Sequence, residues 1–133
     1  MKILLVDDDE GNLDVLEGIL SPHGECDRSV DGREAVEFFE AALRRNEPYD
    51  LVCLDIMMPE MNGQDALKAI RAMEVELDVP LTVIWMVTAL DTSKEQIEAI
   101  YKGGCNGYIT KPYTKQKIME YMINHGFIEL KPS

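Results

Sequence analysis

The sequence has little of several features that mark common protein classes. Its 133 residues contain no apolar stretch near the roughly 18 residues that a membrane helix needs, so we expect no membrane span. Only three cysteines are present and none form a CxxC pair, which argues against a disulfide scaffold and a zinc site. Basic residues number 13 against 25 acidic ones, for a net charge of −12, so direct binding to nucleic acid is not expected.

The first residues also lack the pattern of a signal peptide. A single Lys precedes a strand-like run that leads directly into acids, and we therefore expect a cytoplasmic protein. Apolar residues make up 46% of the chain and charged residues 29%, which is typical of one soluble globular domain at this length. His23 and His125 lie far apart, each near a glycine, and we expect neither to be a ligand or a catalytic group.

What the chain does have is a fivefold alternation of short apolar strands and amphipathic helices. The expected strands are residues 2–6, 25–30, 50–54, 81–87 and 107–110. Two expected helices are residues 10–20 and, approximately, residues 63–75. The other three are recognised by their caps: one is capped by Asp31 and stops before Pro48, one is capped by Thr92 or Ser93 and ends at Gly103, and one is capped by Thr114 and ends at Gly126. Alternation with nearly continuous apolar strands indicates an α/β fold whose parallel sheet is covered on both faces.

Polar side chains gather where the expected strands end. Asp7 and Asp8 follow the first strand, Asp55 the third, Thr88 the fourth and Lys111 the fifth. Taken singly, each has a simpler explanation. Acids after strands often cap the next helix, as Asp9 could at residues 10–20, whereas Thr88 could be a polar strand end and Lys111 a surface charge. Right-handed crossovers bring all carboxyl ends of a parallel sheet to one edge, where ligands bind, so together the five residues predict a site.

These residue types suit phosphoryl transfer with a divalent cation. Mg²⁺ prefers oxygen ligands, and Asp8 and Asp55 could supply them, with Asp7 acting directly or through water. A carboxylate such as Asp55 can also act as a nucleophile and form an acyl phosphate. The Lys111 ammonium and the Thr88 hydroxyl would then hold the phosphoryl oxygens.

Over residues 2–126 the chain resembles a response-regulator receiver domain. Four segments carry the resemblance: residues 4–9 (LLVDDD), 51–63 (LVCLDIMMPEMNG), 87–89 (VTA) and 107–113 (GYITKPY). The resemblance implies a doubly wound (βα)5 fold, a flavodoxin-like three-layer sandwich with strand order 2-1-3-4-5. It also implies a receiver domain over residues 1–127, followed by a C-terminal tail at 128–133.

The same resemblance assigns roles to individual residues. Asp55 would be the phosphoacceptor, with Thr88 and Lys111 contacting the phosphoryl group, and Tyr108 would be an aromatic switch that moves inward with Thr88. The Lys111–Pro112 bond matches a position where the family usually has a cis peptide. The implied Mg²⁺ ligands are Asp7, Asp8, Asp55 and the backbone carbonyl of Met57.

Some positions depart from the usual pattern of the family. Tyr113 stands where Phe is common, which we regard as a mild change. The interval from Asp55 to Thr88 is a few residues longer than usual, through residues 74–79, which leaves the end of the third helix in doubt. Met57 and Leu90 match positions that tune the lifetime of the acyl phosphate, and because both are apolar we expect slow self-dephosphorylation.

The implied function is a phosphorylation-dependent switch rather than a conventional enzyme. A histidine kinase or phosphotransfer protein would donate the phosphoryl group, and the domain would catalyse only its own phosphorylation and dephosphorylation. A downstream protein or a second copy would dock on the fourth helix, fifth strand and fifth helix. Whether the chain acts alone or comes from a longer protein stays open.

Three other functions fit the fold class less well. A haloacid-dehalogenase-like phosphatase would need a second Asp two positions after the nucleophile, where this chain has Met57. A flavin or dinucleotide binder would need a phosphate-cradling loop after the first strand, where this chain has acids at residues 7–9. A degenerate receiver that is never phosphorylated is disfavoured because all five site residues are present.

Overall fold

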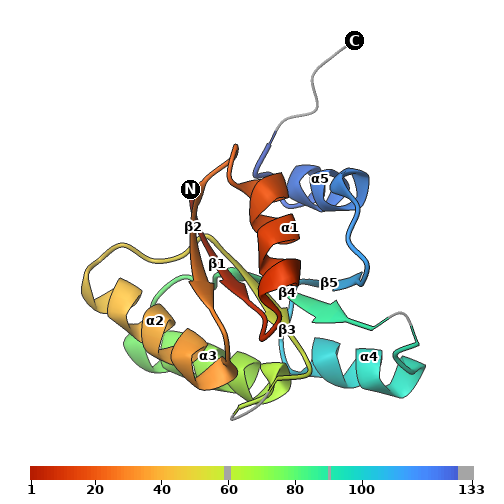
Figure 1. The fold of residues 1–133 in the computed structure, drawn as a ribbon. Coiled ribbons are helices and arrows are strands. Elements are labelled where there is room, and N and C mark those ends of the chain that lie inside the picture. Colours follow the sequence, from red (N-terminus) through yellow and green to blue (C-terminus); the bar gives the residue numbers. More distant parts are fainter. Residues whose placement is uncertain (59–60, 90, 129–133) are drawn as a thin grey trace.

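The fold is an α/β sandwich of three layers, described by a computed structural model for residues 1–58, 61–89 and 91–128 (Figure 1). Five parallel strands form one sheet in the order β2-β1-β3-β4-β5, as predicted. The strands are β1 (Lys2–Val6), β2 (Glu25–Ser29), β3 (Leu51–Asp55), β4 (Val83–Thr88) and β5 (Gly107–Thr110). The helices are α1 (Glu10–Leu20), α2 (Gly32–Arg44), α3 (Gly63–Leu77), α4 (Lys94–Lys102) and α5 (Lys115–Asn124).

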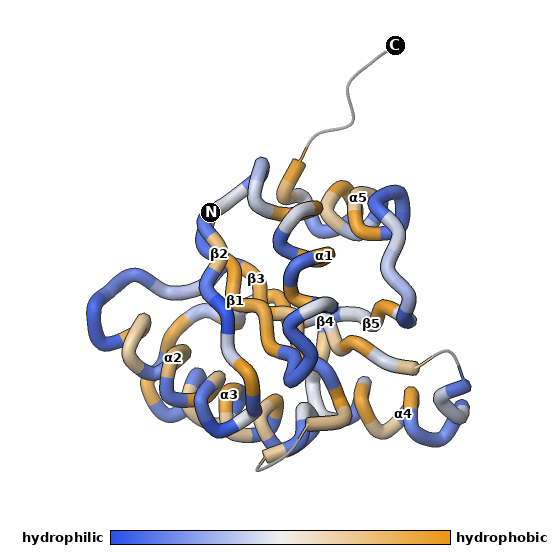
Figure 2. Tube along the Cα trace, viewed as in Figure 1, coloured by the Kyte–Doolittle hydropathy of each residue, from blue (hydrophilic) through white to orange (hydrophobic). Residues whose placement is uncertain are grey.

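Successive side chains of a strand point to opposite faces of the sheet, so both faces here carry apolar side chains. Helices cover each of these two faces. One core layer joins Leu4, Val52 and Ile84 to the buried sides of α2, α3 and α4. The opposite layer joins Ile3 and Trp85, with their neighbours, to α1 and α5. Figure 2 shows the matching pattern, with apolar strands at the centre and helices that are apolar on one side only. Each strand of the middle of the sheet is therefore buried on both faces, as its continuous apolar run predicted.

Most helix starts coincide with the caps predicted from the sequence. Asp9 accepts hydrogen bonds from backbone N–H groups at the start of α1, and Asp31 does the same at α2. Ser93, rather than Thr92, caps α4 through a complete capping box with Gln96, and Thr114 caps α5. These short-range contacts fix where each helix begins after the loop that leaves the sheet.

Two strands end one residue later than predicted. Asp55 and Thr88 are the last residues of β3 and β4, and not the first residues beyond them. The reason is that both still pair in the ladder, Asp55 opposite Val87 and Thr88 opposite Thr110. The backbone of both site residues is therefore held by the sheet itself.

The third helix runs to Leu77, two residues beyond the predicted end, and a buried ion pair accounts for its last turn. Glu74 is buried, and its carboxylate accepts hydrogen bonds from Arg71 Nη1 at 2.7 Å and from the Thr82 backbone N–H at 2.6 Å. The Arg71 guanidinium also donates to the Gly104 carbonyl at 2.9 Å. A buried charge needs such partners, and here they fasten α3 to the start of β4 and to the loop before β5.

Among the described residues, every helix is too short or too polar to span a bilayer.

The start of α3 is packed directly against the strand that ends in Asp55. The Gly63 N–H donates to the Ile56 carbonyl at 3.0 Å, and a Cβ at Gly63 would lie only 2.2 Å from the Asp55 carbonyl oxygen. No side chain larger than hydrogen fits there without moving backbone. Gly63 therefore sets how closely α3 approaches the third strand.

We expect Gly63→Ala to lower the free energy of unfolding by about 2–3 kcal/mol, because the new methyl group overlaps backbone. Gly18→Ala is the matched control, since a Cβ at exposed Gly18 in α1 meets nothing within 4 Å. That change should raise stability by about 0.5–1 kcal/mol. Urea denaturation of both variants measures the difference, and equal effects at the two glycines would contradict the close approach.

Candidate functional site

Three carboxylates meet at the carboxyl edge of the sheet. Asp7 and Asp8 leave the end of β1, and Asp55 ends the neighbouring strand β3. One oxygen from each of the three lies within 4.8 Å of the other two. Asp7 and Asp55 are buried, whereas Asp8 is exposed, so the cluster is open to solvent on one side.

The backbone after β1 holds Asp7 and separates its role from that of Asp9. Asp7 Oδ1 accepts a hydrogen bond from the Asp9 N–H at 2.9 Å. Asp9 turns the other way and accepts from the Gly11 N–H at 2.8 Å, which makes it the cap of α1. The three consecutive acids therefore divide into two that face the site and one that starts a helix.

Lys111 provides the positive charge that faces the carboxylates. Its Nζ lies 3.0 Å from Asp55 Oδ2 and 3.3 Å from Asp7 Oδ2. Its backbone N–H donates to the Thr88 carbonyl at 2.8 Å, which extends the pairing of the last two strands. The Lys111–Pro112 peptide bond is cis, at the position where the resemblance places one. Burial opposes the charge of Lys111, but its contacts with Asp55 and Asp7 outweigh this and raise its pKa.

Thr88 lies on β4, which pairs with β3, and Tyr108 lies on β5, which pairs with β4. Thr88 is buried, and its Oγ1 has no hydrogen-bond partner within the part of the chain that the structure describes. Tyr108 is partly buried on β5, and its ring packs edge-on against Tyr101 of α4 with 6.0 Å between ring centroids. A buried hydroxyl without a partner is rare in folded proteins, which makes Thr88 a candidate for contact with a bound group.

The surroundings of Asp55, the candidate phosphoacceptor, shift the pKa of its carboxyl group. Burial raises the pKa of its carboxyl to about 6, the Lys111 hydrogen bond works in the opposite direction, and the charge of Asp7 adds to the rise. The Met57 N–H also donates to Asp55 Oδ1, at 3.3 Å. Near neutral pH the site therefore holds negative charges that one ammonium group does not balance.

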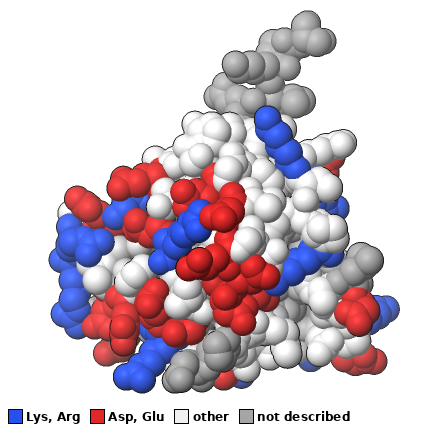
Figure 3. Space-filling model, viewed as in Figure 1, with Lys and Arg blue, Asp and Glu red and all other residues white. Residues whose placement is uncertain are grey.

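The donor set fits a hard divalent cation. All three clustered ligand atoms are carboxylate oxygens, the type that Mg²⁺ prefers, and the open side leaves room for water or a phosphate oxygen. Figure 3 shows acidic side chains gathered where β1 ends and α1 begins, with basic side chains around them. A cation bound there would counteract the burial and the repulsion by Asp7 that raise the pKa of Asp55.

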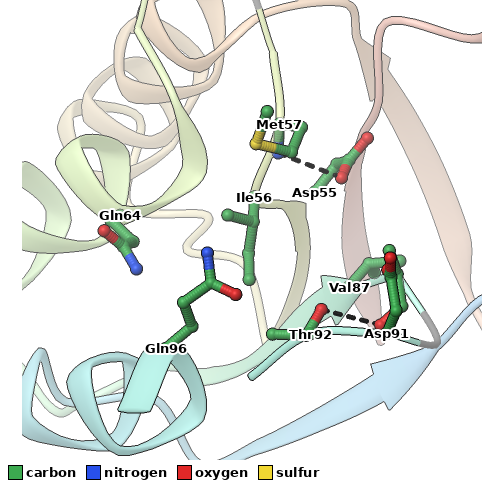
Figure 4. A pocket seen from close by; sticks show the side chains of 9 residues that line it. Asp55, Ile56, Met57, Gln64, Val87, Asp91, Thr92 and Gln96 are labelled. Carbon is green, nitrogen blue, oxygen red and sulfur yellow. Dashed lines mark hydrogen bonds between the residues drawn. The ribbon is translucent and has the colours of Figure 1, made fainter. Parts of the chain in front are cut away.

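A cavity of about 340 Å³ opens beside Asp55 and reaches toward α3 and α4. In Figure 4 Asp55 and Met57 stand at one side of it, and the amide side chains of Gln64 and Gln96 at the other. Sequence reasoning did not find Gln64 or Gln96, because neither follows a strand. The only sequence signal that these residues line the cavity was their place in the first turns of α3 and α4, two helices that start at this edge of the sheet.

Met57 and Leu90 were expected to tune the lifetime of a phosphoryl group. Met57 is 77% exposed and lines the cavity next to Asp55, where its side chain is apolar. Leu90 lies outside the described residues.

Tyr113 contributes a contact that the sequence did not reveal. Its Oη lies 3.4 Å from Asp7 Oδ2, across 106 positions of the chain. The sequence signal for this contact was Tyr in place of the usual Phe, because the two side chains differ only by the hydroxyl group.

Comparisons with known proteins agree on one family. The family model described as response regulator receiver domain matches residues 3–123. A Campylobacter jejuni protein described as a chemotaxis protein CheY homolog is 35% identical over 120 residues, covering 90% of this chain and 88% of the relative.

Solved structures give the same picture of the fold. Vibrio cholerae CheY4 superposes with a TM-score of 0.76 at 27% identity, covering 92% of this chain and 96% of that one. The CheX–CheY–BeF3–Mg²⁺ complex from Borrelia burgdorferi gives a TM-score of 0.80 at 24% identity, covering 97% and 90%, a likeness that concerns the fold.

The raised pKa of Asp55 has a consequence for stability that can be measured. The free carboxyl titrates near 3.8 and the folded one near 6, so between these values the folded state binds more protons than the unfolded state. Stability without divalent ions therefore falls as pH rises through about 6, and ionised Asp55 destabilises the fold at pH 7.

Asp55→Asn should raise the free energy of unfolding at pH 7 in EDTA by about 1–2 kcal/mol, less than the pKa difference implies because Asn keeps only part of the Lys111 contact. The gain should shrink below pH 6, where wild-type Asp55 is protonated. Asp78→Asn, an exposed change of the same kind, should stay within about 0.5 kcal/mol. Thermal unfolding from pH 5 to 8 checks this, and a destabilised Asp55→Asn would contradict the electrostatic strain.

Proposed function

This chain belongs to the response-regulator receiver domain family, and we propose that Asp55 is the residue on which it accepts a phosphoryl group. A receiver domain is a phosphoacceptor signalling module rather than a conventional enzyme, and the acidic pocket of Asp7, Asp8 and Asp55 is typical of such a module. One observation supports the assignment above the others. Asp55 is the buried carboxylate of the cluster that lines the cavity, and it lies nearest to Lys111 Nζ, at 3.0 Å against 3.3 Å for Asp7.

The proposed chemistry is an in-line displacement at phosphorus. A carboxylate oxygen of Asp55 forms the new P–O bond while the P–N bond of a donor phosphohistidine breaks, and the imidazole leaves with a proton from solvent. Lys111 moves from the carboxylate to a phosphoryl oxygen, and the Thr88 hydroxyl donates to a second one. Among the described residues Thr88 Oγ1 has no hydrogen-bond partner, which supports this role because transfer would supply an acceptor.

Mg²⁺ is the proposed cofactor. Asp8 and Asp55 would hold it, with Asp7 and the backbone carbonyl of Met57 completing the protein ligands. A bound ion would offset the negative charge that gathers on the phosphoryl oxygens during transfer. The Borrelia burgdorferi complex, which contains CheY, BeF3 and Mg²⁺, is in keeping with this assignment.

Output is proposed to follow from the added charge beside Thr88. Thr88 would turn toward the phosphoryl group and Tyr108 would move inward, altering the face formed by α4, β5 and α5. A downstream protein or a second copy would read that face, and a histidine kinase or phosphotransfer protein would be the donor. The relative from Borrelia burgdorferi was solved with a protein partner, CheX. We propose residues 1–127 as the receiver domain, residues 128–133 as a tail, and the cytoplasm as the location.

Incubation with acetyl phosphate and Mg²⁺ should add one phosphoryl group to the wild type and none to Asp55→Asn, because Asn has no nucleophilic oxygen. Intact mass spectrometry in the presence and absence of EDTA measures both points. Asp65→Asn, which removes an exposed acid from the start of α3, should be labelled like the wild type. A wild type that stays unlabelled would indicate a degenerate receiver, and labelled Asp55→Asn would place the acceptor elsewhere.

The apolar approach to Asp55 should make the acyl phosphate long-lived. Replacing exposed Met57 by Gln introduces a group that can orient an attacking water, and we expect loss of the phosphoryl group to become several times faster. The decay of phosphorylated protein after removal of the donor gives the rate. Met57→Leu, which keeps the position apolar, should decay at the wild-type rate, and unchanged or slower loss in Met57→Gln would contradict the idea.

A further inference from the structure

Tyr113 connects the loop after β5 with the metal-binding edge of β1. Its ring packs against the core layer beneath α1 and α5, together with Ile118 and Leu13. Its hydroxyl extends beyond that layer and lies 3.4 Å from Asp7 Oδ2. The ring is thus held by packing, while the hydroxyl is the one polar atom that it brings to the site.

Asp7 is held by three donors from two parts of the chain. Asp7 Oδ1 accepts from the Asp9 N–H at 2.9 Å. Asp7 Oδ2 faces both Lys111 Nζ, at 3.3 Å, and Tyr113 Oη. Lys111 is shared with Asp55, to which it is closer at 3.0 Å. Tyr113 is therefore the partner of Oδ2 that does not also serve Asp55.

The direction of the hydrogen bond is fixed by chemistry. A phenol hydroxyl, whose ordinary pKa is about 10, keeps its proton at physiological pH. A carboxylate can only accept, so Tyr113 donates to Asp7. The contact would persist when Lys111 turns from the carboxylates to a phosphoryl group.

We propose that Tyr113 is a positioning residue for Mg²⁺, which holds the Asp7 carboxylate in the orientation that lets Asp7, Asp8 and Asp55 share one ion. The inference rests on the proposed function, and it assigns to Tyr113 a role that a phenylalanine could not perform. Groups that donate hydrogen bonds to a metal ligand fix its orientation, and their loss typically lowers metal affinity about 10–100-fold. Because 3.4 Å is long for an O–H···O bond, we expect an effect near the lower limit.

Tyr113→Phe removes the hydroxyl and keeps the ring. We expect its dissociation constant for Mg²⁺ to rise roughly tenfold. Titration with MgCl2, followed by the amide NMR shifts of residues at the site, measures this without any phosphoryl donor.

Tyr49→Phe is the matched control, because the chain offers a second tyrosine–carboxylate bond far from the site. Tyr49 Oη donates to Asp27 Oδ2 at 2.6 Å, and Tyr49 precedes β3 at the opposite end of the strand from Asp55. This variant should bind Mg²⁺ like the wild type, so a general effect of losing a buried phenol hydroxyl would be recognised.

A double-mutant cycle tests whether Tyr113 acts through Asp7. In an Asp7→Ala background, Tyr113→Phe should have no further effect on Mg²⁺ affinity, because the acceptor is gone. Unchanged or tighter Mg²⁺ binding in the single Tyr113→Phe variant would overturn the proposal, and so would an undiminished effect in the Asp7→Ala background. Failure of the wild type itself to bind Mg²⁺ at the site would instead refute the metal part of the proposed function.

Discussion

Repulsion among carboxylates at one edge of a parallel sheet is the constraint on which the rest of this structure depends. β3 ends in Asp55, Asp7 directly follows the last residue of the adjacent strand β1, and the pairing of Val6 with Leu54 leaves the two acids level. Two of the three acids are buried, where charge is poorly solvated. The fold tolerates them because Lys111 lies between Asp7 and Asp55, yet the pKa of Asp55 still rises to about 6.

The surrounding structure holds this unfavourable arrangement in place. Asp55 and Thr88 are backbone-paired within the sheet, and Gly63 brings α3 into contact with the Asp55 carbonyl. At the far end of the same helix, buried Glu74 and Arg71 fasten α3 to the start of β4. The acidic cluster lowers the free energy of unfolding, and packing and hydrogen bonds elsewhere offset this loss, as is common at functional sites. A divalent cation, or a phosphoryl group near Lys111 and Thr88, would relieve the strain, which is how we connect the geometry to switching.

Much of this architecture was predictable because its signals are local. Apolar runs placed the five strands, and caps such as Asp9, Asp31 and Thr114 placed the helices, since these depend on neighbours within a few residues. The grouping of Asp7, Asp8 and Asp55 followed from topology, because parallel strands share one carboxyl edge. The strand order itself came from resemblance to a family and not from periodicity.

What the sequence did not reveal depends on how the layers pack. The last turn of α3 is set by a carboxylate that meets the Thr82 backbone across the loop, which no periodicity encodes. The contact of Tyr113 with Asp7 joins residues 106 positions apart. The lack of a partner for Thr88 Oγ1 within the described part of the chain depends on the packing of several elements around it. Such features concern single atoms at the meeting of several elements, where a shift of one ångström changes the chemistry.

The most direct test of the central claim is the location of a divalent ion in crystals of the protein grown with Mn²⁺, by anomalous scattering. Our account predicts one ion at the edge of β1 and β3, with oxygens of both Asp8 and Asp55 at about 2.1–2.2 Å, as expected for a hard divalent cation with carboxylate ligands. An ion bound by only one of these two side chains, or no ion at the cluster at millimolar concentration, would contradict it.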